Sequence, residues 1–343
     1  MKTLRELGEI SLIERIQKKC GTWTANNFSV QVANGDDAFV LQTRAKTQLL
    51  FSTDTLVENT HFNLEWMARY WTPKQLARLL GEKLMAVNLS DLAAMGDVRP
   101  IFALITLGLN GDTSASFVDN FYDGAQIFLR KCGYCIAGGD IIRSEKSILS
   151  ATIVGEAISS RILRRSCAQD GDILMVSGAQ GCAAAGLKIL QDALPAAERW
   201  EKKLLMAQVS PQPRLEVGSF LAQKKGGSAT AAIDTSDDLF TSLEILSKQS
   251  GLGIEVQLQG ISLDKNLLKF CQKYELDPWE FFMFGGEDYQ LLFTVPYKKV
   301  ETVQRRFPES YVIGTLRKDI SGIRILQGAS PAKLKDKRFN HFK

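Results

Sequence analysis

The sequence predicts an α+β protein of two domains. A chain of 343 residues is longer than one average domain, and 45% of its residues are hydrophobic, which suffices for a large core. The first half alternates β-rich runs with long helical patterns, and the second half opens with a strand, a glycine-containing turn and a helix. We therefore expect an N-terminal α+β domain over residues 1–158 and a C-terminal α/β domain over residues 159–343.

The elements of the first domain follow from apolar runs and capping residues. Short strands are predicted at 39–41, 48–52, 101–107 and 147–158. A long helix is predicted over 72–95, because Pro73 suits the first turn of a helix. A second, amphipathic helix over 114–131 begins with a Thr or Ser cap. The basic stretch 161–165 and residues 169–172 form the expected junction to the second domain.

The second domain is predicted to alternate strands with helices. Strands are expected at 173–177, 229–233, 253–258, 290–295 and 311–315, and helices at 182–190, 213–223, 239–249 and 263–273. The turn at 178–181 precedes the first of these helices and has two interpretations. It either binds phosphate at the helix N-terminus or simply permits close packing of the helix through its small residues.

The balance of charge gives no indication of a nucleic-acid partner. The formal net charge is +4, from 42 basic and 38 acidic residues. No apolar run approaches the roughly 20 residues of a membrane span, and the first residues carry Glu6, Glu9 and Glu14 without a continuous apolar stretch. We therefore expect neither a nucleic-acid partner nor a membrane association, and a cytoplasmic location.

The cysteines are predicted to be reduced. Six of them are scattered along the chain, without the dense spacing of a secreted disulfide scaffold. Cys132 and Cys135 form a CxxC pattern, but they follow the predicted end of a helix, whereas a redox CxxC gains its thiolate at a helix N-terminus. With two histidines in the chain and no second CxxC, a zinc site also lacks partners. We expect these two cysteines to be buried and inert.

Six acidic motifs flanked by Gly, Ser or Thr indicate a shared metal and phosphate site. They are Asn34-Gly35-Asp36-Asp37, Ser52-Thr53-Asp54, Leu89-Ser90-Asp91, Gly138-Gly139-Asp140, Asp234-Thr235-Ser236-Asp237 and Gly285-Gly286-Glu287-Asp288. Each one alone is an ordinary turn former. Six with the same pattern, most of them after an apolar run, favour carboxylates delivered at strand ends to Mg²⁺, which prefers hard oxygen ligands shared with substrate phosphates.

Several enzyme classes lack their required motifs in this chain. There is no Gly-x-x-x-x-Gly-Lys-Ser/Thr loop, no protein-kinase catalytic loop and no Gly-x-Ser-x-Gly elbow. A glycosidase would use two carboxylates and leave most of the acidic motifs unexplained. Phosphoryl transfer requires mainly positioning and neutralisation of charge, and metal ions held by carboxylates supply both.

The ordered motifs resemble those of the thiamine-monophosphate kinase family, in the superfamily of aminoimidazole ribonucleotide synthetase and selenophosphate synthetase. The resemblance spans nearly the whole chain. It rests on Gly8-Glu9-Ile10-Ser11-Leu12-Ile13, Gly35-Asp36-Asp37-Ala38, Ser52 to Phe62, Val87 to Gly96, Gly138-Gly139-Asp140, Asp234-Thr235-Ser236-Asp237, Gly285 to Tyr289 and Phe339-Asn340-His341-Phe342. It implies a two-domain synthetase-like fold whose N-terminal sheet domain dimerises, and hence a homodimer.

The resemblance also implies an activity and a set of site residues. The activity is ATP-dependent phosphorylation of thiamine monophosphate to thiamine diphosphate, by direct, Mg²⁺-assisted in-line transfer. The implied Mg²⁺ ligands are Asp37, Ser52, Thr53, Asp54, Asp91, Asp140, Asp234 and Asp237, with Asp54, Asp91 and Asp234 as the catalytic carboxylates. The implied nucleotide-binding residues are Gly139, Asp140, Arg165 and Ser236, and the implied substrate-binding residues are His61, Glu287 and Phe339.

The chain departs from the family pattern at three positions. Asp238 stands where the family usually has glycine, and Ile141 and Ile142 replace two threonines after Asp140. A Cβ and a charge at Asp238 would hinder close approach of phosphate. Two alternatives therefore stay open: a nucleotide-binding homologue with lost or altered turnover, and an enzyme that activates another small acceptor with ATP.

Overall fold

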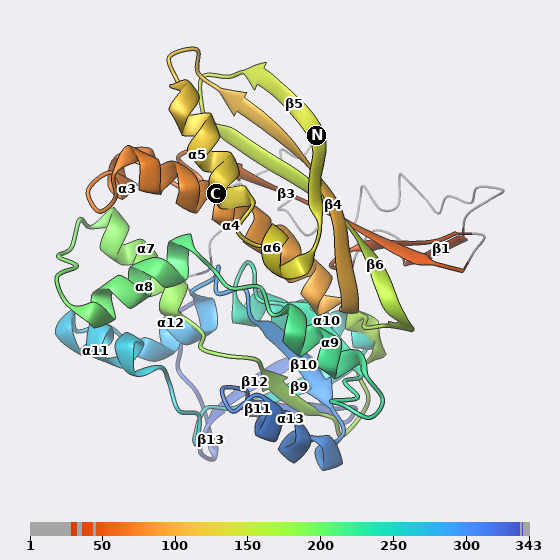
Figure 1. Cartoon of the computed structure of the whole chain (residues 1–343). Helices are drawn as coiled ribbons and strands as arrows, with labels where there is room; N and C mark the ends of the chain where they lie inside the picture. Colours follow the sequence, from red (N-terminus) through yellow and green to blue (C-terminus); the bar gives the residue numbers. More distant parts are fainter. Residues whose placement is uncertain (1–28, 33–35, 44–45, 337, 339–343) are drawn as a thin grey trace, which may run out of the picture.

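The fold is built around two β-sheets, one above the other in Figure 1. This computed structural model describes residues 29–32, 36–43, 46–336 and 338. The upper sheet has six strands in the order β1 (Ser29–Val32), β2 (Phe39–Gln42), β3 (Gln48–Val57), β6 (Ile148–Ile162), β4 (Gly96–Leu109) and β5 (Cys135–Arg143). Neighbouring strands are antiparallel, except that β4 and β5 are parallel.

The lower sheet has seven strands. Their order is β13 (Ser330–Pro331), β12 (Ile323–Gln327), β9 (Gly253–Gln257), β11 (Tyr311–Arg317), β7 (Ile173–Val176), β10 (Leu291–Val295) and β8 (Ala231–Asp234). Only β9 and β12 are parallel; the other described pairs are antiparallel. β8 lies at the edge of this sheet, and Asp234 is its last residue.

Helices pack against both sheets in the described part of the chain. In the upper half these are α3 (Leu64–Met67), α4 (Pro73–Ala94), α5 (Ala115–Ala125) and α6 (Leu129–Cys132). In the lower half they are α7 (Cys182–Gln191), α8 (Arg199–Val209), α9 (Leu215–Ala222), α10 (Leu239–Ser250), α11 (Lys265–Lys273), α12 (Pro278–Phe284) and α13 (Val300–Arg306). Short 3₁₀ turns lie at Arg165–Cys167 and Tyr297–Lys299.

Helix α4 is the central element of the structure, and its capping residues explain where it begins. Thr72 and Gln75 form a capping box and Pro73 occupies the first turn, as the sequence predicts. The helix packs against the upper sheet, and α5 crosses it closely (Figure 1). The crossing is close because Gly81 of α4 faces the backbone of Phe121 and Gly124 of α5 faces the backbone of Arg78.

One predicted helix and three predicted strands differ from the observed elements. The single helix predicted over 114–131 is interrupted: Ser114 caps α5, which ends at Ala125, and α6 begins only at Leu129. The intervening turn places Phe128 in the core. The upper strands are also longer than predicted, since β3, β4 and β6 contain 10, 14 and 15 residues. Short runs of apolar residues therefore underestimate strands whose other face is polar.

One face of the upper sheet is not covered by any described element. Along β3, residues Ser52 and Leu56 are buried, whereas Thr53 and Thr55 are exposed. The exposed face continues through Leu104 of β4, and nearly all of the edge strand β5 is exposed. An open face and an unpaired edge on a sheet of this length are features that proteins usually cover.

The hydrophobic core does not divide at the predicted domain boundary. Residues of α4 pack in one core cluster with Ile189 of α7 and Leu205 of α8. The end of α4, at Ala93 and Ala94, packs in another cluster with residues of the lower sheet. Strand β6 itself continues past residue 158 to Ile162. The boundary at 158 remains a prediction.

The close crossing of α4 and α5 leads to a stability prediction. A Cβ atom at Gly124 would lie 1.9 Å from the carbonyl oxygen of Arg78. Gly124→Ala should therefore lower the free energy of unfolding by about 1–3 kcal/mol, as overpacked cores do. Gly111→Ala is the matched control, because no atom lies within 4 Å of the Cβ it would add. Denaturant unfolding measures both, and equal midpoints for the two variants would contradict the prediction.

Candidate active site

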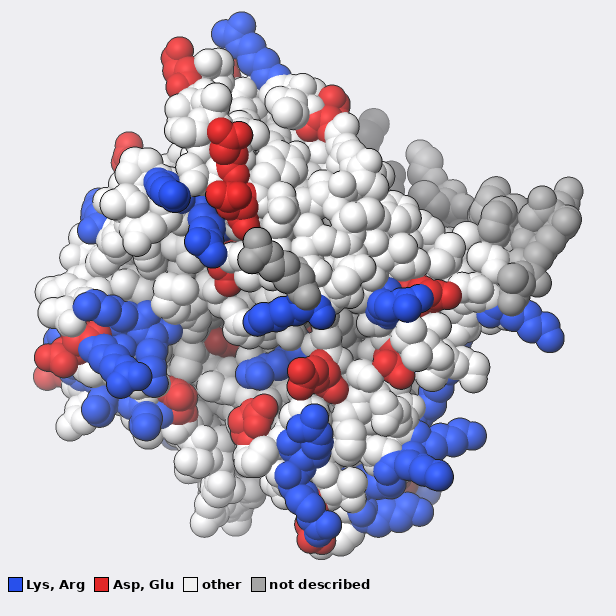
Figure 2. Space-filling model, viewed as in Figure 1, with Lys and Arg blue, Asp and Glu red and all other residues white. Residues whose placement is uncertain are grey.

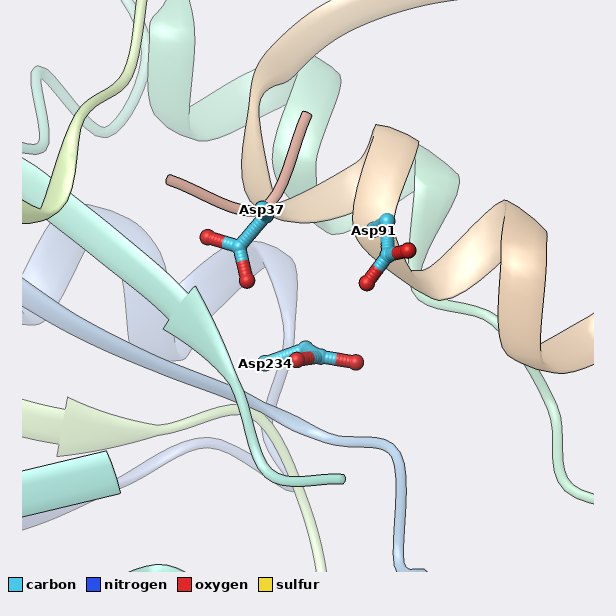
Figure 3. Close-up of side chains that lie close together, drawn as sticks. All are labelled: Asp37, Asp91 and Asp234. Carbon is cyan, nitrogen blue, oxygen red and sulfur yellow. The ribbon is translucent and has the colours of Figure 1, made fainter. Parts of the chain in front are cut away.

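Three carboxylates from distant parts of the chain meet between the two sheets. Asp37 lies in a bend before β2, Asp91 in the last turn of α4 and Asp234 at the end of β8. One carboxylate oxygen of each lies within 4.8 Å of those of the other two. Figure 3 shows the three side chains facing a common space. We refer to these residues as the carboxylate cluster.

Neighbouring polar groups hold each member of the carboxylate cluster in place. Ser52 of β3 donates a hydrogen bond from its hydroxyl to Oδ2 of Asp91. The Ser90 hydroxyl donates to Oδ2 of Asp234 over 2.7 Å, so α4 contacts the lower half directly. These bonds fix the orientation of the carboxylates without neutralising them.

Arg165 supplies the positive charge nearest to the cluster. Its guanidinium binds Asp37 through two bonds, Nη2 to Oδ1 at 2.6 Å and Nε to Oδ2 at 3.1 Å. Such a bidentate pair gives geometric specificity as well as energy. The neighbouring Asp36 accepts a bond from the backbone N–H of Arg165, and burial followed by the charge of Asp37 raises the pKa of Asp36 to about 6.

The electrostatics of the cluster favour a cation. Burial raises the pKa values of Asp91 and Asp234 well above their usual range, and the neighbouring carboxylates raise them further. Burial also raises the pKa of Asp54 to about 6, and the charge of Asp237 adds to this effect. Carboxylates that repel one another in a partly dry site are destabilised unless a metal ion binds.

The donor set fits a magnesium ion. All donors at the cluster are hard oxygens of carboxylates, the ligands that Mg²⁺ takes from proteins together with water and substrate phosphates. Asp37, Asp91 and Asp234 would hold the ion, with Asp54 and Asp237 beside them. Asp54 shares a side-chain hydrogen bond with Asp91, which places it next to the cluster.

Three of the predicted acidic turns are not turns. Asp54 lies in the middle of β3, Asp91 lies inside α4 and Asp140 lies within β5. The expectation that strand ends deliver the carboxylates is therefore wrong for Asp54 and Asp140, whereas Asp91 lies in the helix predicted over 72–95. Asp54 faces the cluster because side chains alternate along a strand, so that it shares a face with Ser52.

Some predicted ligands lie away from the carboxylate cluster. The Thr53 hydroxyl is on the opposite face of β3 and accepts a hydrogen bond from Thr152 at 3.0 Å. Gly139 and Asp140 lie on β5, which β6 and β4 separate from β3. With strands spaced about 4.8 Å apart, β5 is about 14 Å from β3. Within one chain, these residues do not join the carboxylates of β3, α4 and β8.

The glycine at 139 has a structural role in this arrangement. A Cβ there would lie 1.7 Å from the carbonyl oxygen of Ile105 on the neighbouring strand. Asp140 is exposed, and its Oδ1 accepts from the backbone N–H of Ile141.

The predicted substrate-binding residues His61 and Glu287 lie after β3 and in the loop that follows α12. The predicted nucleotide-binding residue Ser236 lies in the loop that follows β8. His61 follows β3, and its Nδ1 accepts a hydrogen bond from the Val57 N–H at 3.0 Å. Glu287 accepts from Lys83 at 3.0 Å and from Gln208. Ser236 accepts, through its carbonyl oxygen, from the N–H of Glu287 at 2.7 Å. Phe339 lies outside the described residues.

The side chain of Asp238 caps the N-terminus of α10. Its carboxylate accepts from the Thr241 N–H at 2.6 Å and from the Thr241 hydroxyl at 3.0 Å, at the start of α10. The side chain is therefore directed into the helix N-terminus. The other two departures, Ile141 and Ile142, are exposed on the edge strand β5.

The glycine turn at 178–181 receives a carboxylate from the chain itself. Asp288 accepts hydrogen bonds from the N–H groups of Gly181 and Ala183 at the start of α7. A Cβ at Gly181 would also lie 2.7 Å from the backbone of Phe281. Of the two interpretations, close packing matches the structure, and the helix N-terminus already holds an anion.

The cysteine prediction is correct in part. All five cysteines in the described residues are free thiols. The helix before the CxxC ends at Gly133 in the left-handed conformation, as expected. Cys135, however, is exposed on the edge strand β5, so the expectation that both cysteines are buried is wrong.

Sequence reasoning missed the residues that support the carboxylates. Ser90, Asp36 and Lys83 belong to this group, and the first two stand beside Asp91 and Asp37 in the motifs themselves. Lys83 lies among buried apolar residues of α4 and is only 3% exposed. A lysine within the apolar stripe of a helix was the signal that could have identified it.

Charges of both signs are spread over the face shown in Figure 2. Lysines and arginines gather at its left side, over α8 and α11; these are Arg199, Lys202, Lys203, Lys265, Lys269 and Lys273. Lys273 is paired with Glu201. No helix among the described residues is long and apolar enough to cross a membrane.

The chain is similar to several known proteins. Residues 35–157 match the family model described as AIR synthase related protein, N-terminal domain. Thiamine-monophosphate kinase of Aquifex aeolicus (strain VF5) is 35% identical over 299 residues, which cover 86% of this chain and 88% of that protein. The enzyme of the same name from Salmonella typhimurium is 32% identical over 340 residues, 98% of both chains.

A solved structure gives the same result in three dimensions. The structure of AaThiL complexed with AMPPCP and TMP matches with a TM-score of 0.85 and 30% sequence identity, and covers 99% of both chains. The fold and the carboxylate cluster thus define a synthetase-like protein of the AIR synthase related class. Within that class, the chain belongs to the thiamine-monophosphate kinase family.

The electrostatics of the cluster give a testable dependence of stability on pH and metal. Because the folded-state pKa of Asp54 is raised from 3.8 to about 6, the stability of metal-free protein should fall as pH rises through about 6. Mg²⁺ should raise the denaturation midpoint more at about pH 8 than at about pH 5, since protons compete for the same oxygens. Calorimetry with and without a chelator measures this, and an equal effect of Mg²⁺ at both pH values would contradict it.

Proposed function

We propose that this protein transfers the γ-phosphoryl group of ATP directly to the phosphate of thiamine monophosphate, giving thiamine diphosphate and ADP. The observation that carries the proposal is the carboxylate cluster, assembled from both halves of a chain that belongs to the thiamine-monophosphate kinase family. The relative AaThiL was solved with AMPPCP, an ATP analogue, and with TMP. Both substrates of the proposed reaction are thus represented in a close structural match.

The reaction requires the protein to position the two substrates and to neutralise the charge of their phosphates. It does not require the protein to transfer a proton. The bond between the β–γ bridging oxygen and the γ-phosphorus breaks as an oxygen of the acceptor phosphate bonds to that phosphorus. The acceptor phosphate has a second pKa near 6, so at neutral pH it is largely deprotonated and needs no general base. Bound Mg²⁺ would neutralise charge on the phosphates during the transfer.

Different residues of the chain would hold the metal and orient its ligands. Asp37, Asp91 and Asp234 hold the metal, and Ser52 and Ser90 orient two of these carboxylates. Arg165 keeps Asp37 in place through its bidentate contact. Its assignment to nucleotide binding remains part of the proposal.

The remaining assignments concern residues around the carboxylate cluster. Ser236 and Glu287 lie in two loops that contact each other beside Asp234 and Asp237. His61 lies at the end of β3, on the strand that carries Asp54. Thr53, Gly139 and Asp140 keep the roles implied by the family resemblance, although none of them contacts the cluster within one chain. Phe339, which lies outside the described residues, keeps its implied role as well. A cytoplasmic location fits the use of ATP and the free cysteines.

The proposed homodimer would cover the open sheet face and the edge strand β5. Ile142 of β5 is 49% exposed, and Leu104, on the same face of the neighbouring strand β4, is 42% exposed. A second copy of the upper sheet would bury these apolar side chains and remove the unpaired edge. A partner would also bring a second copy of Asp140 near this face.

The dimer gives a prediction about molecular mass. Light scattering at micromolar concentration should give twice the chain mass of 38.0 kDa. Ile142→Lys should shift the protein toward the monomer, because a charge in an apolar interface remains without a partner. Leu268→Lys, at an exposed position on α11, is the matched control and should leave the mass unchanged. A wild-type protein that is monomeric under these conditions would contradict the dimer.

The departures of the chain give little support to the alternative of lost turnover. The carboxylate of Asp238 is satisfied by the start of α10, and it therefore need not repel a phosphate. Activation of a different small acceptor stays testable by assaying a panel of acceptors with the same protein and ATP.

Asp54→Asn tests the function and the metal site together. Wild-type protein with ATP, Mg²⁺ and thiamine monophosphate should produce thiamine diphosphate. The variant keeps the shape of the side chain and removes its charge, so turnover should fall on the order of 100-fold or more. Its metal-free stability should hold or rise, because a repelling carboxylate is gone.

Asp119→Asn, on the exposed side of α5, is the control and should retain turnover. The proposal fails if wild-type protein makes no thiamine diphosphate above a metal-free blank. Near-normal turnover of Asp54→Asn at limiting Mg²⁺ would remove Asp54 from the metal site while leaving the reaction intact.

A further inference from the structure

A buried ion pair joins α4 to the loop that follows α12. Lys83 is 3% exposed, and its Nζ lies 3.0 Å from Oε1 of Glu287. The second carboxylate oxygen of Glu287 accepts from Nε2 of Gln208 on α8, which is also buried. The side chain of Glu287 is therefore held by two other elements at once.

The loop that carries Glu287 lies directly on the segment that carries two of the candidate metal ligands. The Glu287 N–H donates to the Ser236 carbonyl at 2.7 Å, and the Tyr289 N–H donates to the Thr235 carbonyl at 3.1 Å. A Cβ at Gly286 would lie 2.0 Å from the carbonyl oxygen of Asp237. The position of this loop therefore determines the position of residues 234–237.

The backbone of the loop is in a conformation that requires external support. Glu287 and Tyr289 have φ values of 57° and 48°, and neither is glycine. Left-handed conformations of such residues persist when the surrounding structure enforces them. The contacts of Lys83 and Gln208 with the Glu287 side chain provide that enforcement.

Helix α4 connects this ion pair with the other half of the cluster. Lys83 lies eight residues before Asp91, which is about 12 Å along a helix and on a similar face. The same helix carries Ser90, whose hydroxyl binds Asp234. One rigid element thus contacts the 234–237 segment directly at Ser90 and indirectly, through Glu287, at Lys83.

We propose that Lys83 is a positioning residue for the metal site: its ion pair with Glu287 fixes the 285–289 loop against α4 and thereby sets Asp234 and Asp237 relative to Asp91. A buried ion pair contributes little net stability compared with apolar residues of the same size, and its best-attested use is to fix register. The inference rests on the proposed function only in taking the carboxylate cluster as a metal site.

The test measures metal affinity in the absence of turnover. Metal-free, full-length protein is titrated with Mn²⁺ as a probe for Mg²⁺, and free Mn²⁺ is followed by its electron paramagnetic resonance. Lys83→Met should weaken the affinity by about 10-fold or more, as loss of groups that orient metal ligands does. Lys273→Met is the matched control, because it breaks a similar ion pair, Lys273 with the buried Glu201 at 2.7 Å, on α11 and α8.

A second variant covers the case in which Lys83→Met does not fold. Glu287→Gln removes the charge from the other partner and should weaken Mn²⁺ binding similarly, and the double variant should bind no more weakly than either single one, since both act through one interaction. Folded Lys83→Met or Glu287→Gln with wild-type Mn²⁺ affinity would overturn the inference, as would an equal loss in Lys273→Met.

The outcomes separate this inference from the proposed reaction. Normal Mn²⁺ affinity in both variants together with a raised KM for thiamine monophosphate would overturn the positioning role and assign Glu287 to the substrate. A wild-type protein that does not bind Mn²⁺ would overturn the metal site and the inference with it. Binding of Mn²⁺ by the wild type and its weakening in the variants would support the inference, even if no thiamine diphosphate were formed.

Discussion

The structure depends on holding several like charges together in a partly buried space. Asp37, Asp91 and Asp234 belong to three different elements, and each brings its carboxylate within 4.8 Å of the others. Folding to this arrangement without a cation is unfavourable, because burial and mutual repulsion both oppose ionisation. The fold offsets the cost with a bidentate arginine at Asp37, serine hydroxyls at the other two carboxylates, and a large apolar core around α4.

Helix α4 explains how such a site stays rigid. It is capped at its start, packed against the upper sheet, and crossed closely by α5 at two glycines. Its last turns then present Ser90 and Asp91 to the lower half of the molecule. A site built on helices and strands is more precise than one built on loops. Asp54 and Asp91 are both placed in this way, on regular elements rather than turns.

The sequence predicted the class of fold and named all three carboxylates that the structure brings together, because acidic residues beside small residues leave a strong local pattern; their binding of a metal stays a prediction. Asp91 lies in the helix predicted over 72–95, but the local structure of Asp54 was not predicted. Asp54 read as a turn residue, since a strand that passes through a polar site loses its apolar periodicity there. Lys83 was missed for a different reason: its partner Glu287 is 204 residues away, so the apolar stripe around Lys83 could indicate burial but not the partner.

The resemblance to a family identified residues that the geometry of one chain does not unite. Gly139 and Asp140 are the clearest example, since β5 lies on the far edge of the upper sheet from β3. Local patterns report chemistry at a residue, but not the strand order that decides which residues become neighbours. Asp238 shows the converse. It departs from the family pattern and would be expected to hinder phosphate binding, but its side chain caps the N-terminus of α10.

The sharing of α4 between core clusters affects how this protein can be dissected. Ala93 and Ala94 pack with the lower half, and other residues of the same helix pack with α7 and α8. A fragment cut after Ile162 would keep α4 but expose this apolar surface to water. We therefore expect that neither half folds on its own and that truncations which separate them yield aggregation-prone fragments. Biophysical work on the isolated upper sheet would report on a different molecule from the intact chain.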